Sequence, residues 1–419
     1  MAEAVEACVH CGFCLPTCPT YRTLGEEMDS PRGRIVLMKS MLEGELDLEQ
    51  GLPFIDRCLG CVACVTACPS GVEYGELVSS FRAHCEEKRR RSLVDRALRA
   101  ILLETLSRPR LLRLAARFAG LGRMVSPLLP SRLRAALELT PRRLEKAPRP
   151  LEASVETQQP AKGERARRVA LLRGCAQDVL APRITAAAEA LLKRRGVDVV
   201  VPAKQGCCGA LALHAGDEKR ARRLGRKTLE SFVGKAGDAA DFDAVITTAA
   251  GCGSGLADYP LLFAGHDSHD AAQELASKSF DVTTFLASLK PVKSEPPRTK
   301  RPMVAVYQDA CHLAHAQQER QAPRRLLEAI EGLELRSAEP WHQCCGSAGI
   351  YNLEQPEIAR QLGREKAEAI LGSGAELVIS GNIGCMMQIE HHLRALGASL
   401  PVRHTVEVLD LAERGELGA

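Results

Sequence analysis

Cys8-Val-His-Cys11-Gly-Phe-Cys14-Leu-Pro-Thr-Cys18-Pro19 stands near the start of the chain, and its cysteine spacing returns unchanged fifty residues later. The second run reads Cys58-Leu-Gly-Cys61-Val-Ala-Cys64-Val-Thr-Ala-Cys68-Pro69. Both follow C-x-x-C-x-x-C-x-x-x-C-P, the spacing by which cysteine thiolates wrap a pair of [4Fe–4S] clusters. The rest of the chain is interpreted outward from these two runs.

The fourth cysteine of each run is expected to cross over to the cluster of the other run. One predicted ligand set is therefore Cys8, Cys11, Cys14 and Cys68. The other predicted set is Cys18, Cys58, Cys61 and Cys64. Structural zinc and disulfides are the alternatives, but zinc sites normally use paired C-x-x-C knuckles. We predict a two-cluster ferredoxin-type domain over residues 1–86.

The stretch between the two runs predicts a helix. Ser30 is suited to cap a helix whose first position is Pro31, and apolar residues then follow helical spacing as far as Gly44. This pattern favours a helical ferredoxin domain of the kind found in respiratory iron–sulfur subunits. Cys85 lies outside both runs, and we expect a free thiol without a role there.

Composition bounds the class of protein. With 419 residues and 45% apolar content, the chain is long enough for about three domains with real cores. Its start, Met1-Ala-Glu-Ala-Val-Glu, lacks the basic and apolar regions of a signal peptide, and no apolar run approaches the ~18 residues of a membrane span. We therefore expect a cytoplasmic chain, soluble or peripheral, in which the clustered cysteines among the 17 bind metal rather than form disulfides.

Residues 87–165 form a basic segment, and Lys88 to Arg168 carries 21 Lys+Arg against 7 Asp+Glu. Apolar residues predict two amphipathic helices there, over 93–103 and 111–118. The segment is suited to dock on an anionic membrane face or an acidic partner subunit. The alternative is that its helices only pack on the domains, with their arginines in water. Nucleic acid is disfavoured, because aromatic residues are few and no binding motif is present.

The remainder of the chain contains an internal duplication, over 166–290 and 303–419, separated by a proline- and lysine-rich linker at Pro291–Pro302. In each copy predicted strands alternate with predicted helices, which implies parallel sheets with right-handed crossovers. The predicted strands are 169–172, 197–201 and 244–248 in the first copy, and 304–307 and 377–380 in the second.

Each copy carries four cysteines in the loops that follow its strands, where a parallel sheet gathers its ligands. These are Cys175, Cys207, Cys208 and Cys252 in the first copy, and Cys311, Cys344, Cys345 and Cys385 in the second. Neighbouring cysteines are too close to bridge each other easily, so each Cys-Cys-Gly suits a metal centre. A further iron–sulfur cluster, zinc, or one centre shared between the copies all remain open.

The whole chain resembles the iron–sulfur subunit of bacterial glycolate oxidase. The resemblance is carried by Cys8 to Cys14, Pro31-Arg-Gly-Arg34, Gly174-Cys-Ala-Gln177, Gln205-Gly-Cys-Cys-Gly209, Cys344-Cys-Gly-Ser-Ala-Gly349 and Asn382-Ile-Gly-Cys385. The two copies are also similar to the cysteine-rich (CCG) domains of heterodisulfide reductase, whose motif has a fifth cysteine. Here Gly255 and Gln388 stand at that position. The fold expected is α+β and multi-domain: a helical ferredoxin domain, a basic helical linker and two tandem α/β CCG domains.

The resemblance implies an electron-transfer subunit without catalytic residues of its own. It would receive electrons from FAD-containing glycolate oxidase subunits, which convert glycolate to glyoxylate, and pass them toward a quinone at the inner face of the membrane. The same role for a lactate or glycerol 3-phosphate dehydrogenase is one alternative. A self-contained thiol or disulfide reductase is another, and the missing fifth cysteines argue against it.

Overall fold

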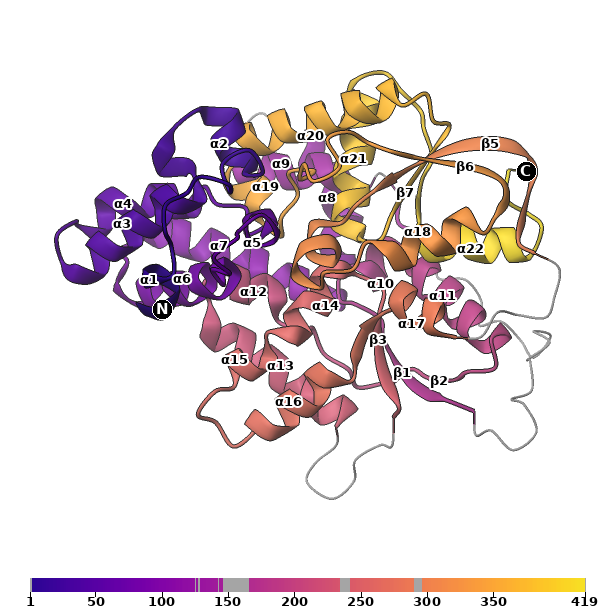
Figure 1. The fold of residues 1–419 in the computed structure, drawn as a ribbon, viewed down its shortest axis with the longest axis horizontal. Helices are drawn as coiled ribbons and strands as arrows, with labels where there is room; N and C mark the ends of the chain where they lie inside the picture. Colours follow the sequence, from indigo (N-terminus) through magenta and orange to yellow (C-terminus); the bar gives the residue numbers. More distant parts are fainter. Residues whose placement is uncertain are drawn as a thin grey trace.

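The structure is a computed structural model, and it describes residues 2–124, 126, 129–141, 143–145, 166–233, 242–289 and 296–418. A helical N-terminal part lies beside two α/β units, and the helices of the basic segment run behind and between them (Figure 1). Each α/β unit has its own parallel four-stranded sheet. The predicted α+β multi-domain class is confirmed.

The N-terminal part contains short helices between the cysteine loops. They are α1 (Ala2–Glu6), α2 (Pro19–Leu24), η1 (Glu27–Asp29), α3 (Pro31–Glu43), α4 (Leu48–Asp56), α5 (Ala63–Thr66) and α6 (Tyr74–Lys88). The helix predicted from Ser30 is confirmed, because the Ser30 hydroxyl accepts the amide of Gly33 at the start of α3. Gly44 ends α3 in a left-handed conformation, with φ 78°.

A buried ion pair holds α3 against the loop before it. The side chains of Arg34 and Asp29 are each only 1% exposed, and Arg34 Nη2 lies 3.0 Å from Asp29 Oδ1. Arg57, at the end of α4, reaches the same carboxylate at 2.8 Å. Asp29 thus forms ion pairs with two guanidinium groups in a buried position, and it links α3 to the end of α4.

The basic segment forms α7 (Leu93–Ser107), α8 (Pro109–Met124) and α9 (Ser131–Leu139). Both predicted helices are present, and their apolar residues are partly buried and partly exposed. In α7 Leu103 is buried while Leu93 is exposed, and in α8 Leu112 is buried while Phe118 is exposed. The last part of the predicted segment, 146–165, lies outside the described residues.

The first α/β unit has its strands in the order β2-β1-β3-β4, all parallel. Its strands are β1 (Arg168–Leu172), β2 (Asp198–Val200), β3 (Ala244–Thr247) and β4 (Ser279–Asp281). Its helices are α10 (Gln177–Leu180), α11 (Pro182–Arg194), α12 (Ala210–His214), α13 (Glu218–Phe232), α14 (Ala250–Ala257), α15 (Tyr259–Leu262), α16 (His269–Ser277) and α17 (Val282–Ser288). The three predicted strands are confirmed, and β4 is an addition.

The second unit repeats the topology as β6-β5-β7-β8. Its strands are β5 (Arg298–Gln308), β6 (Glu331–Ser337), β7 (Leu377–Ser380) and β8 (Val402–His404). Its helices are the π-helix η3 (His312–Ala316), α18 (Gln321–Glu328), α19 (Tyr351–Glu354), α20 (Pro356–Gly372), α21 (Ile383–Ala395) and α22 (Thr405–Glu413). β5 begins inside the predicted linker, and residues 291–295 of that linker lie outside the described part of the chain.

The two α/β units share one continuous core. Residues of β1 and α11, such as Leu171 and Ile184, belong to the same buried cluster as Tyr307 of β5 and Val406 of α22. Ion pairs follow the same seam: Arg194 of α11 reaches Asp410 of α22 at 2.7 Å. The two units are therefore packed together as one body rather than held by the linker alone. Among the described residues, no helix combines the length and the apolar character needed to cross a membrane.

We predict that Asp29→Asn lowers the free energy of unfolding of the N-terminal part by about 3–5 kcal/mol, because it leaves a buried guanidinium charge without its partner. Urea denaturation followed by circular dichroism measures this change. Glu27→Gln is the matched control, since Glu27 pairs with Arg32 on the surface, with side chains 46% and 31% exposed. It should cost less than about 1 kcal/mol. Equal effects of the two substitutions would contradict the prediction.

Candidate functional site

The two N-terminal cysteine loops have the same backbone conformation. His10 and Gly60, each two residues after the first cysteine of a run, have φ of 55° and 67°. Gly12 and Val62, each one residue after the second cysteine, have φ of 86° and 52°. Two of these four residues, His10 and Val62, are not glycine. For a residue with a side chain, the left-handed backbone conformation costs about 1–2 kcal/mol. The repeated tight turn turns the cysteines of each loop toward one centre.

Two cavities gather the cysteines in the predicted sets. One is lined by Cys8, Cys11, Cys14 and Cys68, and also by Cys64. The other is lined by Cys18, Cys58, Cys61 and Cys64. The fourth cysteine of each run therefore lies with the first three cysteines of the other run. Because Cys64 lines both cavities, the two sites are direct neighbours.

The second of these sites is rich in positive charge. Arg34 Nη1 lies 3.9 Å from Cys18 Sγ, and the Tyr74 hydroxyl lies 3.8 Å from Cys58 Sγ. Burial raises the pKa of the Cys58 thiol, but the charges of Arg34 and Arg82 outweigh it and lower the pKa overall. These groups favour a thiolate, which is the form that binds iron. The cysteine spacing did not predict them, although Arg34 belongs to the quoted Pro31-to-Arg34 motif.

The two sites differ in their exposure. In the first, Cys11 is exposed and the neighbouring Phe13 is 66% exposed. In the second, all of the cysteines are buried, and burial raises the pKa of Cys61 and Cys64 well above the ordinary thiol value. The first site therefore opens to the surface, while the second lies inside the molecule.

The first α/β unit brings its four cysteines to the carboxyl edge of its sheet. Cys175 follows β1, Cys207 and Cys208 follow β2, and Cys252 lies in the first turn of α14 after β3. Cys175 Sγ and Cys207 Sγ are 3.3 Å apart. Hydrogen bonds from Cys207 and Cys252 lower the pKa of Cys208 well below the ordinary thiol value.

The second unit repeats this arrangement with Cys311, Cys344, Cys345 and Cys385. Thiol contacts join Cys311 to Cys344 and Cys345 to Cys385. The Asn382 side chain adds a hydrogen bond to Cys385 Sγ at 3.4 Å. Contact with Cys344 and burial raise the pKa of Cys311 well above the ordinary thiol value. When a metal cation binds such a set of buried thiols, it displaces their protons and the sulfurs become thiolate ligands.

The glycine of each Cys-Cys-Gly is required by the backbone. Gly209 and Gly346 have φ of 85° and 82°. A Cβ there would lie 2.7 Å from the carbonyl oxygen of Ala221 or 2.6 Å from that of Ala359. Each glycine amide also points at the first cysteine of its pair, with N to Sγ distances of 3.5 Å. The same turn thus aims the cysteine pair in both copies.

The position of the missing fifth cysteine is filled by packing in both copies. A Cβ on Gly255 would lie 2.4 Å from the Cβ of Ala210, so α14 and α12 meet closely there. Gln388 donates to the carbonyl of Ala359 at 3.3 Å and accepts from Asn352 at 3.1 Å. Each copy therefore offers four thiols, the number that a cubane [4Fe–4S] cluster or a tetrahedral zinc uses.

The buried N-terminal site lies against the cysteines of the second copy. Cys61 packs in one apolar cluster with Cys344 and Tyr351, and the charges of Cys61 and Cys311 act on each other. Thr66 and His315 share a hydrogen bond of 2.9 Å across the same seam. His315 is thus a packed histidine at this contact.

The cysteine edges of the two copies also face each other. Ser254 of α14 lies 2.5 Å from His312 Nδ1, one residue after Cys311. The amide of Ala250, close to Cys252, donates to the carbonyl of Gly381 at 3.3 Å. Three of the four cysteine sets therefore gather where the three parts of the chain meet, and the first N-terminal set adjoins them through Cys64.

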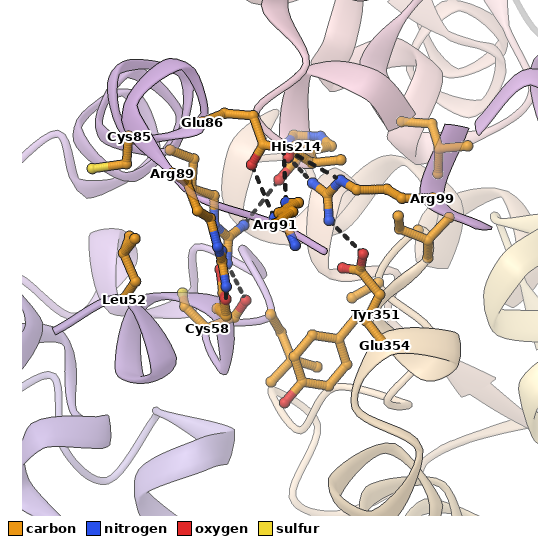
Figure 2. A pocket seen from close by; sticks show the side chains of 18 residues that line it. Leu52, Cys58, Cys85, Glu86, Arg89, Arg91, Arg99, His214, Tyr351 and Glu354 are labelled. Carbon is orange, nitrogen blue, oxygen red and sulfur yellow. Dashed lines mark hydrogen bonds and ion pairs between the residues drawn. The ribbon is translucent and has the colours of Figure 1, made fainter. Parts of the chain in front are cut away.

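Figure 2 shows a cavity of about 50 Å³ at this junction, bordered by Cys58 and by arginines of α6, α7 and the segment between them. Arg89 pairs with Asp56 at 2.6 Å, and Arg91 pairs with Glu86 at 2.9 Å. Arg99 pairs with Glu354 of the second copy. For these arginines the packing interpretation of the basic segment holds, because each is held by a carboxylate of the chain.

Across the described residues, no three His, Cys, Asp or Glu side chains converge closely enough to hold a single metal ion. A four-iron cube binds one cysteine at each iron, so its ligands stand farther apart than those of a single ion. The cysteine sets of the N-terminal part fit that donor pattern. The donor groups of these sets are all cysteine thiols, and tight turns hold them in place. Arginine charges beside the second set offset the negative charge of its thiolates.

Comparison with known proteins agrees with this geometry. Residues 4–72 match the 4Fe-4S dicluster domain, and residues 169–257 and 305–390 match the cysteine-rich domain. A Bacillus subtilis protein named probable glycolate oxidase iron-sulfur subunit is 35% identical over 96% of this chain and 92% of its own length. The glycolate oxidase iron-sulfur subunit of Escherichia coli is 34% identical over 97% of this chain and 94% of its own.

The chain belongs to the glycolate oxidase iron–sulfur subunit family. It is an iron–sulfur protein, as the predicted [4Fe–4S] clusters and cysteine-rich domains required. Lactate utilization protein A of Shouchella clausii is 32% identical over 58% of this chain and 99% of its own length. A crystal structure of a hypothetical protein from Helicobacter pylori shares the fold, with a TM-score of 0.55 and 9% identity, over 91% of this chain and 67% of that one.

We predict that anaerobically purified protein contains more than the about eight irons of two four-iron clusters. The double substitution Cys208→Ser with Cys345→Ser should remove the excess, because it deletes one central thiol from each copy. Iron analysis together with electron paramagnetic resonance measures both values. Cys85→Ser, which changes a buried cysteine outside all four sets, is the control and should leave the iron content unchanged. Iron at the two-cluster value in the unaltered protein, without zinc, would show that the copies bind no metal.

Proposed function

We propose that this chain is the iron–sulfur electron-transfer subunit of a glycolate-oxidising complex. It receives electrons from an FAD-containing subunit that converts glycolate to glyoxylate, and passes them toward a quinone. Four-iron clusters carry one electron at a time. The proposed ligands are Cys8, Cys11, Cys14 and Cys68 for one cluster and Cys18, Cys58, Cys61 and Cys64 for the other, in a domain of residues 1–86.

The observation that carries the proposal is the unbroken succession of cysteine sites. The loop around Cys11 opens to the surface, and Cys64 joins its cavity to the buried one. Cys61 then lies against Cys344 of the second copy, whose cysteine edge faces that of the first. This order supports a relay that begins or ends at the exposed loop, where Val9 and Phe13 offer an apolar contact surface to a redox partner.

Glycolate is favoured over lactate by the extent of the similarity. The glycolate oxidase relatives match 96% and 97% of this chain, whereas the lactate utilization relative matches 58%. A self-contained disulfide reductase is disfavoured, since packing by Ala210 and Asn352 fills the fifth-cysteine position in both copies. We propose CCG domains at 166–290 and 303–419, after a basic helical linker at 87–165. The limits 165 and 290 lie outside the described residues.

We predict that the isolated chain does not reduce a dye with glycolate, whereas the purified complex does. The physical reason is that substrate oxidation needs the flavin of the partner subunit. In the complex, Cys64→Ser should leave flavin reduction by glycolate intact but abolish dye reduction downstream of the iron–sulfur chain, because Cys64 lines both N-terminal cavities. Stopped-flow absorbance at flavin and iron–sulfur wavelengths separates the two steps.

Cys85→Ser serves as the matched control, since Cys85 is buried in the same core but lies in neither cavity. The complex is assayed in parallel with lactate and with glycerol 3-phosphate. Glycolate turnover by the chain alone would overturn the subunit role. Turnover of lactate or glycerol 3-phosphate in preference to glycolate would move the role to another dehydrogenase.

The basic segment offers a surface for the membrane face where a quinone resides. Along α8 four exposed apolar residues form one stripe: Leu111, Leu114, Phe118 and Leu121. Arg110 and Arg117 border this stripe and are exposed. An apolar helix stripe edged with arginine is suited to lie in the interface of an anionic bilayer. We propose that α8 docks the chain peripherally on the cytoplasmic leaflet.

Phe118→Asp with Leu121→Asp should weaken binding to vesicles that contain phosphatidylglycerol by at least tenfold, because each lost apolar side chain contributes about 1.5–3 kcal/mol on burial. Vesicle co-sedimentation at low and high salt measures this. Leu261→Asp on α15 is the control, since Leu261 is also exposed (41%) but lies away from the basic helices. Unchanged vesicle binding with reduced capture of the flavoprotein would instead identify the stripe as a subunit contact.

A further inference from the structure

Lys366 of α20 is a positive charge buried in the second copy. Its side chain is 0% exposed, although lysine is among the residues most rarely buried. Its ammonium group donates to the carbonyl oxygens of Ala338 and Pro340, at 3.3 and 3.2 Å. Neutral carbonyls hold the ammonium group in place but supply no opposite charge.

No carboxylate forms an ion pair with Lys366 within the described part of the chain. The charges of Asp309 and Glu339 also act on Lys366. The Asp309 carboxylate is bound by Arg324 at 2.6 Å, and that of Glu339 accepts a hydrogen bond from the amide of Trp341 at 3.2 Å. A buried ammonium without a counter-ion is costly, so an opposite charge is expected beside it.

Packing places Lys366 near the cysteines of this copy, because Ala338, which accepts its hydrogen bond, and the adjacent Ala367 lie in one buried cluster with Cys345 and Cys385. Burial lowers the pKa of Lys366, and the charges of Cys345 and Cys344 oppose that fall.

The first copy provides an internal comparison. Gly209 packs on the carbonyl of Ala221 in α13, as Gly346 packs on that of Ala359 in α20. Thr228 follows Ala221 by the same number of residues as Lys366 follows Ala359, so the two residues occupy equivalent positions in the two copies. Thr228 is also 0% exposed, and its neutral hydroxyl donates to the carbonyl of Cys207 at 3.1 Å. The duplicated site thus has a fixed cation in one copy and a neutral hydroxyl in the other.

We propose that Lys366 is the fixed counter-charge of an anionic metal centre held by Cys311, Cys344, Cys345 and Cys385, and that it gives this centre a higher reduction potential than its counterpart in the first copy. The proposal rests on the cysteine sets proposed above as ligands. It makes the two copies unequal: the centre beside the buried N-terminal site is the better electron acceptor.

The physical basis is Coulombic. One-electron reduction adds a negative charge to the centre, and a nearby positive charge stabilises the reduced state more than the oxidised one. The effect is strong here because the lysine and the cysteines lie in a dry interior, where charges are poorly screened. The carbonyls of Ala338 and Pro340 fix the ammonium group, so little of the effect is lost to side-chain motion.

The test is a redox titration of the full-length protein, followed by electron paramagnetic resonance. Cys345→Ser and Cys208→Ser first assign signals to the second and first copies. Lys366→Met should then lower the equilibrium constant for reduction of the second-copy centre at least tenfold, about 59 mV for one electron. Lys366→Arg should hold it within threefold of the unaltered protein. Thr228→Val, the matched substitution, should leave both centres unchanged.

A second-copy potential that stays the same in Lys366→Met overturns the role of Lys366 and leaves the cysteine ligands standing. Protein with iron for the two N-terminal clusters alone overturns the role of Lys366, and if zinc is absent as well, it also overturns the cysteine ligands. If Lys366→Met fails to assemble the centre, Lys366→Arg decides. Assembly with a near-native potential supports the counter-charge, whereas loss of the centre in both variants means that the lysine acts only as an anchor for the Ala338–Pro340 loop.

Discussion

Crowding of cysteine thiols in a dry interior is the constraint on which this structure depends. Ionised thiols repel one another and lose the solvation of water when they are buried, so they require positive charge nearby. Around Cys58 that charge comes from Arg34 and Arg82. Beside Cys344 and Cys345 it comes from Lys366. A metal bound by the cysteines would supply further positive charge.

Arg82 links this electrostatic role to the assembly of the parts. Its guanidinium donates to the carbonyls of Ile55 and Cys58 within the N-terminal part, and to His214 of the first copy at 3.0 Å. The side chain that lowers the pKa of Cys58 therefore also holds two modules together. The arginines of the basic segment act in a similar way, as with Arg99, which reaches Glu354 of the second copy. Some of the arginines that make the segment basic are therefore paired with carboxylates of this chain and are not available to an external partner.

The duplication shows which features the fold requires and which can diverge. The left-handed glycines 209 and 346 meet the same helix carbonyl at nearly the same distance, so the turn that aims the paired cysteines is unchanged. Buried positions around it have diverged, as Thr228 and Lys366 show. Backbone constraints have kept the geometry of the site, while side-chain changes have altered its charge.

The sequence by itself determined the two ferredoxin-type runs, the capped helix at Ser30, the parallel α/β duplication and its cysteine sets, because spacing, capping and strand alternation are local patterns. It predicted the helices of the basic segment but left open which apolar residues are covered, since burial of Leu103 and exposure of Phe118 depend on distant neighbours. Only the tertiary structure decided that three of the sites meet at one junction and that Lys366 packs near one of them. Those contacts join residues hundreds of positions apart, and no local pattern records them.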